Sequence, residues 1–209
     1  KQLPEDKQTA TLINDYRKIY PELLEVLAIV NEPLMRKYNE ESSIGNLLTD
    51  YMKKAAQSDI AFLNSGAIRA DLNTGDVTLE QLINVYPFKD NLTVIKLTGN
   101  QIKELIEYSL TLPYGIGQVS GLKIKYDSTQ DEMKRVIDIK VNGNDLMDNE
   151  KYTVSVSGYL AKGGDGYRVF PEGRFVNDDK PFQDALYEEF KKAKIIEIPT
   201  SDRLIDISK

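Results

Sequence analysis

The 209-residue sequence contains neither cysteine nor histidine. Without cysteine the chain can form no disulfide, no thiolate metal site and no cysteine nucleophile, and it is compatible with an oxidising compartment without identifying one. Without histidine a Ser-His-Asp triad and an imidazole zinc site are excluded, because histidine is the commonest general base near neutral pH and the commonest transition-metal ligand. Chemistry by this chain alone must use carboxylates, lysine or tyrosine, unless the chain binds rather than reacts.

Long apolar runs are also missing, and none approaches the ~20 residues that a membrane-spanning helix needs. Hydrophobic residues make up 41% and charged residues 29% of the chain, which is typical of a globular protein. The net charge of −6 argues against a general nucleic-acid binder, which would need a basic surface. The chain starts with "KQLPEDKQTA", without a methionine or the pattern of a signal peptide, so we expect a part of a longer protein.

Apolar residues at helical spacing alternate with short strand patterns along the chain. The predicted helices are residues 12–20, ending at Pro21; 44–55, capped by Ser42 or Ser43; 79–84, with the capping box Thr78 and Gln81; 102–110, with Thr98 and Gln101; and a last helix over Phe182–Phe190, capped by Asp179. The predicted strands are residues 22–37, interrupted at Pro33; 59–63; 92–97; 122–127; 135–141; 151–157; and 195–207. The pattern predicts one mixed α/β domain, a mixed sheet with packed helices.

Three loops beside these strands carry isolated functional groups: residues 64–71, 87–91 and 158–167. Loops at strand ends are the usual place for binding groups on a rigid scaffold. In the first loop, Arg69 is either a surface arginine or a group presented to an anion, because its planar fork suits phosphate. In the second, Phe88 is either a core residue or a stacking surface. In the third, Asp165 lies among glycines and either bonds to nearby amides or accepts from a ligand's hydroxyls.

Five motifs that contain these loops occur in an order that resembles the C-terminal, substrate-binding domain of the 5′-nucleotidase family. The motifs are "ESSIGNLLTDYM" (41–52), "DIAFLNSGAIRADLNTGDVT" (59–78), "VYPFKDNLTVIKLTGNQI" (85–102), "QVSGLKIKYD" (118–127) and "GYLAKGGDGYRVF" (158–170). Five ordered matches are far more specific than any single motif.

The resemblance implies a two-domain enzyme. An N-terminal metallophosphoesterase domain would hold two divalent metals, zinc, manganese or similar, through histidines and carboxylates, and would cleave the phosphate ester. This chain would then have no catalytic residue, cofactor or metal site of its own, which accounts for the missing histidine. Residues 1–20 would include the helix that joins the two domains, and residues 21–209 would form the nucleoside-binding domain. Family habit implies a bacterial protein that is secreted, periplasmic or attached to the cell surface.

The resemblance also assigns roles to residues of the three loops. Phe88 and Tyr159 would sandwich the base, and Asp165 would accept hydrogen bonds from the ribose hydroxyls. Asn64 and Arg69 would lie at the scissile end, with Arg69 on the phosphate. The glycines around Asp165 would let the sugar approach the backbone closely. These residues predict a partner that is a small nucleotide or nucleoside rather than a nucleic-acid polymer.

One further position and two departures complete the resemblance. Gly121 matches a backbone position beside the base. Many members carry one or two arginines just before the Gly-Asn motif, whereas this chain has Tyr-Asn-Glu at 38–40. The family loop "PFGN" is replaced by "PFKDN", which would place Lys89 and Asp90 as a charged pair beside the stacking ring. The resemblance therefore implies a nucleotide hydrolase domain; the alternatives are a non-catalytic binding module, or a relative that acts on nucleotide sugars or 2′,3′-cyclic nucleotides.

Overall fold

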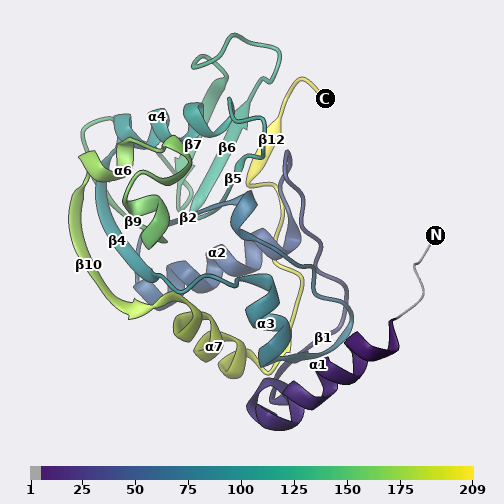
Figure 1. The fold of residues 1–209 in the computed structure, drawn as a ribbon. Coiled ribbons are helices and arrows are strands. Elements are labelled where there is room, and N and C mark those ends of the chain that lie inside the picture. The colour runs from purple at the N-terminus through teal and green to yellow at the C-terminus, as the bar shows by residue number, and fades with distance from the viewer. Residues whose placement is uncertain (1–5) are drawn as a thin grey trace.

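The computed structural model describes residues 6–209, which form three sheets and seven α-helices (Figure 1). The mixed α/β class is as the sequence predicts, but the strands form three sheets, not one. Residues 1–5 of the predicted linker segment lie outside the described range. The α-helices are α1 (Lys7–Ile19), α2 (Ser43–Ala56), α3 (Leu79–Val85), α4 (Gly99–Ser109), α5 (Gly158–Ala161), α6 (Val169–Glu172) and α7 (Phe182–Ala193). Single 3-10 turns are η1 (Pro21–Leu24), η2 (Ser65–Ala67) and η3 (Gly164–Gly166).

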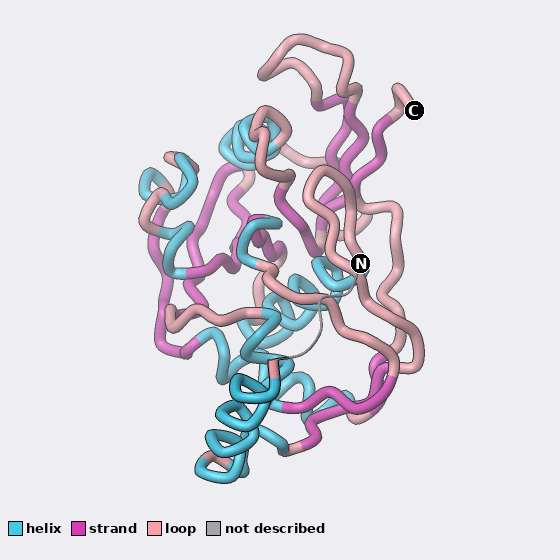
Figure 2. The backbone as a smooth tube through the Cα atoms, turned by 45° about the vertical axis from the view of Figure 1, so that its right-hand side comes forward, coloured by secondary structure: helices cyan, strands magenta, loops and turns pink. Residues whose placement is uncertain are grey.

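A mixed five-stranded sheet lies at the centre of the molecule, in the order β10-β4-β9-β2-β5. Only β2 and β9 are parallel; the other neighbours are antiparallel. Figure 2 shows the four-stranded sheet, β12-β6-β7-β8, beside the C-terminus, and the third sheet is β11-β1-β3. The strands are β1 (Val26–Val30), β2 (Ile60–Asn64), β3 (Gly75–Thr78), β4 (Asn91–Thr98), β5 (Gly117–Ser120), β6 (Leu122–Tyr126), β7 (Val136–Val141), β8 (Asn144–Asp145), β9 (Lys151–Ser157), β10 (Arg174–Pro181), β11 (Ile195–Ile196) and β12 (Leu204–Asp206).

Strand β2 separates two hydrophobic cores, because its successive side chains point to opposite faces of the sheet. Ala61 and Leu63 enter a core that includes residues of α2 and α7, whereas Ile60 and Phe62 enter a second core that includes residues of α4. All five residues of β2 are buried. A strand that is held on both faces gives a rigid base to the loop that follows it.

The helix caps predicted at the starts of α2, α3 and α4 are confirmed, and each involves a partner only three residues away. Ser42 caps α2 by accepting a hydrogen bond from the amide of Gly45 at 3.1 Å. Complete capping boxes start α3 at Thr78 and α4 at Thr98. In each case the cap satisfies amides that the first helical turn leaves without an intrahelical partner.

Three predicted elements differ from the structure. The segment 22–37 forms a strand only over Val26–Val30, because Pro21 starts a 3-10 turn before it. Asp179 does not cap α7; it lies in β10, whose pairing with β4 continues to Pro181. The tail 195–207 is two short strands in different sheets, since β11 pairs with β1 and β12 pairs with β6.

Helix α1 lies at one end of the molecule and buries none of its residues (Figure 1). It is joined to the rest of the domain through η1 and through an ion pair between Arg17 and Glu80 at 3.0 Å. Its apolar residues Leu12, Tyr16 and Ile19 are exposed. Within residues 6–209, no helix has both the length and the apolar character needed to cross a bilayer.

Candidate functional site

The three loops singled out in the sequence meet at one edge of the central sheet. Strands β2 and β9 are parallel, so their carboxyl ends, Asn64 and Ser157, lie at the same edge. Strand β4 is antiparallel to β9 and starts at this edge with Asn91, directly after the loop 87–91. A cleft of about 670 Å³ lies among the loops. Five of the six predicted site residues line it: Asn64, Arg69, Phe88, Tyr159 and Asp165.

Asp165 is held in this cleft by a turn that is rich in glycine. Its own backbone is left-handed, with φ at 52°, and Gly163 and Gly166 on either side of the turn have φ at 85° and 82°. Its carboxylate accepts a hydrogen bond from the Tyr159 hydroxyl at 2.7 Å on one oxygen and from the Asn64 side-chain amide at 2.6 Å on the other. Since a carboxylate oxygen can accept two hydrogen bonds, each oxygen can accept one more, which suits a pair of ligand hydroxyls.

Tyr159 presents an exposed aromatic ring to the cleft, and 52% of the residue is accessible. One face of the ring lies on Gly164: a Cβ added there would be 2.5 Å from Cδ1 and Cζ of the ring. The hydrogen bond to Asp165 raises the pKa of Tyr159, so the hydroxyl remains a donor at neutral pH. The residue therefore combines an apolar surface with a group that orients the neighbouring carboxylate.

Phe88 and Arg69 form another part of the cleft lining. Phe88 is half-buried and packs edge-to-face on Tyr86, with ring centroids 5.4 Å apart, while also lining the cleft. The Arg69 guanidinium lies 5.3 Å from the Phe88 ring centroid, within the range of a cation–π contact. Arg69 is exposed, and among residues 6–209 no carboxylate forms an ion pair with it. Its fork is therefore able to bind an anion.

Asp90 joins two of the loops, a role that the sequence did not reveal. Its carboxylate accepts from the Tyr86 hydroxyl at 2.8 Å and from the Tyr159 amide at 3.1 Å. Lys89 and Asp90 both line the cleft with Phe88; within residues 6–209 no ion pair joins them, and the Asp90 carboxylate faces these two donors. The four-residue spacing of Tyr86 and Asp90 is the only local signal. Asp90, which the sequence "PFKDN" has in this loop, thus connects the backbone of Tyr159 to Tyr86, on which Phe88 packs.

Gly121 is not brought into the cleft. It lies in the turn between β5 and β6, with φ at 78°, a conformation that favours glycine. A Cβ at this position would collide with the carbonyl of Asp59, the residue directly before β2, and Gly121 is not among the residues that line the cleft. Gly121 lines a separate polar hollow of about 390 Å³ together with Arg203. The left-handed backbone and the close approach to Asp59 account for a glycine at this position.

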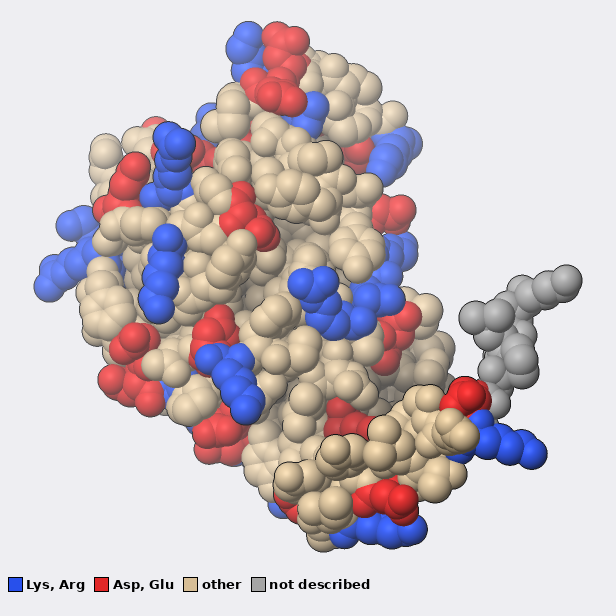
Figure 3. Space-filling model, viewed as in Figure 1, with Lys and Arg blue, Asp and Glu red and all other residues tan. Residues whose placement is uncertain are grey.

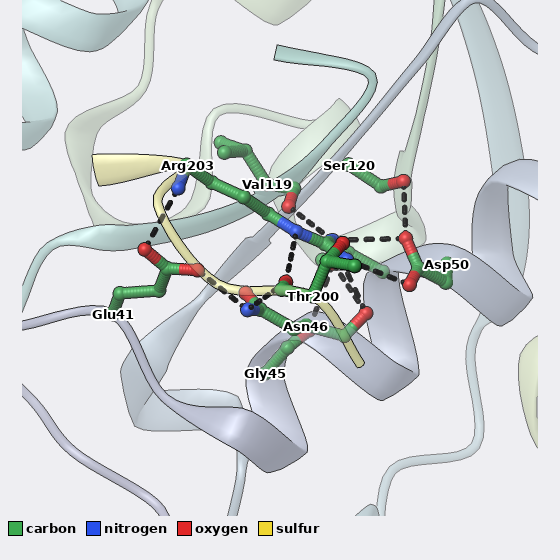
Figure 4. A network of polar contacts seen from close by, with 9 residues as sticks. Glu41, Gly45, Asn46, Asp50, Val119, Ser120, Thr200 and Arg203 are labelled. Carbon is green, nitrogen blue, oxygen red and sulfur yellow. Dashed lines mark hydrogen bonds and ion pairs between the residues drawn. The ribbon is translucent and has the colours of Figure 1, made fainter. Parts of the chain in front are cut away.

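The first resemblance motif holds the C-terminal tail instead of lining the cleft (Figure 4). Arg203 forms a bidentate ion pair with Asp50 of α2, at 2.8 and 2.7 Å, and donates to the Val119 carbonyl at 2.9 Å. The Glu41 carboxylate accepts from the Arg203 amide at 2.8 Å and from the Asn46 side chain at 2.6 Å. These contacts fix the tail against α2 and β5 and leave Tyr38 as the part of this region that lines the cleft.

The segment before the Gly-Asn motif supplies little positive charge to the cleft. Tyr38, in the segment where the resemblance would place one or two arginines, lines the cleft. Arg36 lies 3.5 Å from Asp71 and donates to the Arg69 carbonyl at 2.6 Å. Lys37 pairs with Glu40 at 2.9 Å. Arg69 and Lys89 are the cations that line the cleft within residues 6–209.

The charged side chains of the described residues are distributed without large clusters of one sign on the face drawn in Figure 3. Positive and negative side chains are interspersed there, without a continuous basic patch. Within residues 6–209, no three aspartates or glutamates lie close enough together to hold a metal ion. The residues described here therefore do not fit the two metals that the family implies, and no step of a reaction is assigned to metals on this chain.

The chain is thus a mixed α/β domain in which aromatic, acidic and cationic side chains line one cleft, and clefts of this kind are where small molecules commonly bind. Residues 24–172 match the family model for "5′-nucleotidase, C-terminal domain". This match covers more than half of the chain, and the chain belongs to that family.

Curated relatives and a solved structure agree with this assignment. The chain is 37% identical over 152 residues to the trifunctional nucleotide phosphoesterase protein YfkN of Bacillus subtilis, covering 66% of this chain and 10% of that protein. It is 31% identical over 172 residues to the cell wall protein Lmo0130 of Listeria monocytogenes, and the match covers 75% of this chain and 22% of that protein. The 5′-nucleotidase precursor of Thermus thermophilus superposes with a TM-score of 0.90 at 27% identity, over 99% of this chain and 44% of that one. The chain thus spans less than half the length of each.

Proposed function

We propose that this chain is the nucleoside-binding domain of a phosphohydrolase that converts nucleotides to nucleosides and phosphate. Phe88 and Tyr159 bind the base, Asp165 reads the ribose hydroxyls, and Asn64 and Arg69 lie toward the phosphate. The observation that carries the proposal is the Asp165 carboxylate, which is fixed by Tyr159 and Asn64 yet keeps one free acceptor position on each oxygen. The Tyr159 ring, which lies on Gly164, and the Phe88 ring, which lies near the Arg69 guanidinium, line the same cleft.

A calorimetric titration of the chain with adenosine and 2′,3′-dideoxyadenosine tests the role of Asp165. Adenosine should bind more tightly, because dideoxyribose leaves the carboxylate without ligand donors, and a buried acceptor left unpaired costs roughly 1–3 kcal/mol. Asp165→Ala should erase the difference. If the variant still discriminates between the two nucleosides, another group reads the sugar.

The catalytic part of the proposal is that the chain alone binds nucleosides weakly and hydrolyses nothing. Two-metal hydrolysis of a phosphate ester needs two ions about 3.5–4 Å apart, which activate water and stabilise the leaving oxygen, and no acidic group in residues 6–209 fits such a site. Incubation with AMP and Mn²⁺, Zn²⁺ or Mg²⁺ should release phosphate only at the background rate. Turnover that remains with the chain through repurification would contradict the proposal.

The second candidate is a binding module without turnover in the full-length protein. It is favoured by the small number of cations in the cleft. Tyr38 lines the cleft in the segment where the resemblance would place arginine, and Arg36 and Lys37 form ion pairs with Asp71 and Glu40 instead. Phosphate release from AMP by the full-length protein with both metals supplied decides between the two. A bacterial surface location, for which the similarity to a cell wall protein is the support, belongs to the same proposal.

A further inference from the structure

The backbone of Asp165 has an uncommon conformation that something in the structure must hold. A non-glycine residue with φ near +50° is uncommon and persists where its surroundings fix it. Asp165 has φ at 52° and ψ at 18°, between Gly164 and Gly166 in the turn η3. The direction of its carboxylate depends on this conformation, because the side chain leaves from the same Cα. A group that fixes the peptide after Asp165 therefore also fixes the carboxylate.

Tyr108, on helix α4, supplies such a group from the opposite side of the turn. Its hydroxyl donates to the backbone carbonyl of Asp165 at 2.9 Å. Within residues 6–209 no other donor forms a hydrogen bond with this carbonyl. The Tyr108 ring is itself held edge-to-face against the buried Tyr167, with centroids 5.1 Å apart and planes at 81°. The hydroxyl is thus anchored to the helix and to the second core.

Gly166 shows that this contact is close. A Cβ on Gly166 would overlap the Tyr108 hydroxyl, so any larger residue would displace it. Tyr108 does not line the nucleoside cleft; it lines a separate hollow of about 300 Å³ behind the turn. The turn is consequently held between Tyr108 on one side and the Tyr159 hydroxyl on the other, which accepts from the Asp165 amide at 3.0 Å.

We infer that Tyr108 is a positioning residue for ribose recognition, which acts through the Asp165 carbonyl without touching the ligand. The inference rests on the proposed function, in which Asp165 reads the sugar hydroxyls. The hydrogen bond from Tyr108 keeps the peptide between Asp165 and Gly166 in the orientation that directs the carboxylate toward Asn64 and Tyr159. Without this bond the turn samples other conformations, and the two free acceptor positions no longer match the spacing of a vicinal diol.

The test compares adenosine with 2′,3′-dideoxyadenosine by calorimetry in the wild-type chain and in Tyr108→Phe. This variant removes only the hydroxyl and keeps the ring against Tyr167. The ratio of the two dissociation constants should shrink by about three- to tenfold, the effect of one hydrogen bond, while dideoxyadenosine binds as before. Tyr187→Phe is the matched control, because it also loses a tyrosine hydroxyl bonded to a neighbouring side chain, Glu25, but far from the cleft; its ratio should not change.

A second measurement follows the turn without a ligand. The Asp165 amide, which donates to the Tyr159 hydroxyl, should exchange its proton with solvent faster in Tyr108→Phe than in wild type and at an unchanged rate in Tyr187→Phe. An unaltered nucleoside ratio in Tyr108→Phe, or an equal loss of affinity for both nucleosides, would overturn the inference while leaving the role of Asp165 intact. If the wild-type chain itself does not discriminate, the proposed function fails and the inference fails with it.

Discussion

Replacing Gly164 by alanine should displace the ring of Tyr159 while leaving the fold in place. The backbone of Gly164 is not in the left-handed region, so alanine meets no conformational strain there. The new methyl group would start 2.5 Å from Cδ1 and Cζ of the Tyr159 ring and closer still to Cε1, whereas ordinary contact begins at 3.4 Å. The ring must therefore retreat by about an ångström. It can do so, because Tyr159 is 52% exposed and moves into the open cleft.

The retreat removes the ring from its stacking position and pulls its hydroxyl away from Asp165. Stacking of a base on an aromatic side chain is worth roughly 1–3 kcal/mol, which corresponds to a loss of affinity of roughly five- to 150-fold. The free energy of unfolding should change by less than about 1 kcal/mol, because the exposed ring moves easily and alanine reduces the entropy of the unfolded chain relative to glycine.

The assay is calorimetric titration with adenosine, together with thermal melting of each variant. Gly158→Ala is the matched control, since it adds the same methyl group in the same loop, where the nearest atoms belong to Asp90 and Asn91 at 3.4 Å. It should bind adenosine as the wild type does. Wild-type affinity in Gly164→Ala would show that the Tyr159 ring is not a stacking surface. Equal losses in both variants would show that the effect does not pass through Tyr159.

Three further changes address other parts of the molecule. Phe88→Ala should weaken adenosine binding by roughly 1–3 kcal/mol; an unchanged titration would mean that Phe88 serves only the core. Arg203→Ala removes the bidentate ion pair with Asp50, a loss of roughly 1.5–3 kcal/mol in the free energy of unfolding. At roughly 2–4 °C per kcal/mol, the melting temperature should fall by roughly 3–12 °C. The affinity for adenosine should stay the same, and an altered affinity would show that the C-terminal tail and the cleft are not independent. For Asp206, burial alone would raise the pKa, but hydrogen bonds from Ser208 and Ser128 outweigh it and hold the pKa at about 2, below the usual 3.8. The folded state therefore gains stability above pH 3.8 and loses it as the pH falls toward 2, and acid melts of Asp206→Asn should lack this part of the loss.

Elements that depend on neighbouring residues could be predicted from the sequence. The Ser42 cap and the capping boxes at Thr78 and Thr98 involve partners three residues away, and all three start helices as expected. The cleft was predictable to the extent that each of its loops follows or precedes a recognisable strand. Their meeting at one edge depends on the parallel pairing of β2 with β9, which joins residues about ninety positions apart, such as Ile60 and Val154.

The elements that were predicted wrongly depend on distant partners. Asp179 is well placed for a cap, but the pairing of β10 with β4 keeps the chain extended to Pro181. The tail reads as one strand, yet Ile195 and Ile196 pair with β1 while Leu204–Asp206 pair with β6. The bridge made by Asp90 has the same character, because its second partner, the Tyr159 amide, lies 69 residues away. The pattern of residues within one segment cannot predict which distant segment it will pair with.

The cleft illustrates how a carboxylate, here the one proposed to bind the ribose, can be fixed in place by neutral donors alone. Asp165 has three supports on three different segments: Asn64 at the end of β2, Tyr159 at the start of α5 and Tyr108 on α4. None of the three is a cation, and only Asn64 and Tyr159 donate to the carboxylate itself, one to each oxygen. An arginine in place of Asn64 would hold the carboxylate more strongly but would occupy both oxygens in the bidentate geometry that arginine favours. Neutral donors, one to each oxygen, hold Asp165 and leave the other acceptor position of each oxygen open; these are the positions that the proposed function gives to the ribose hydroxyls.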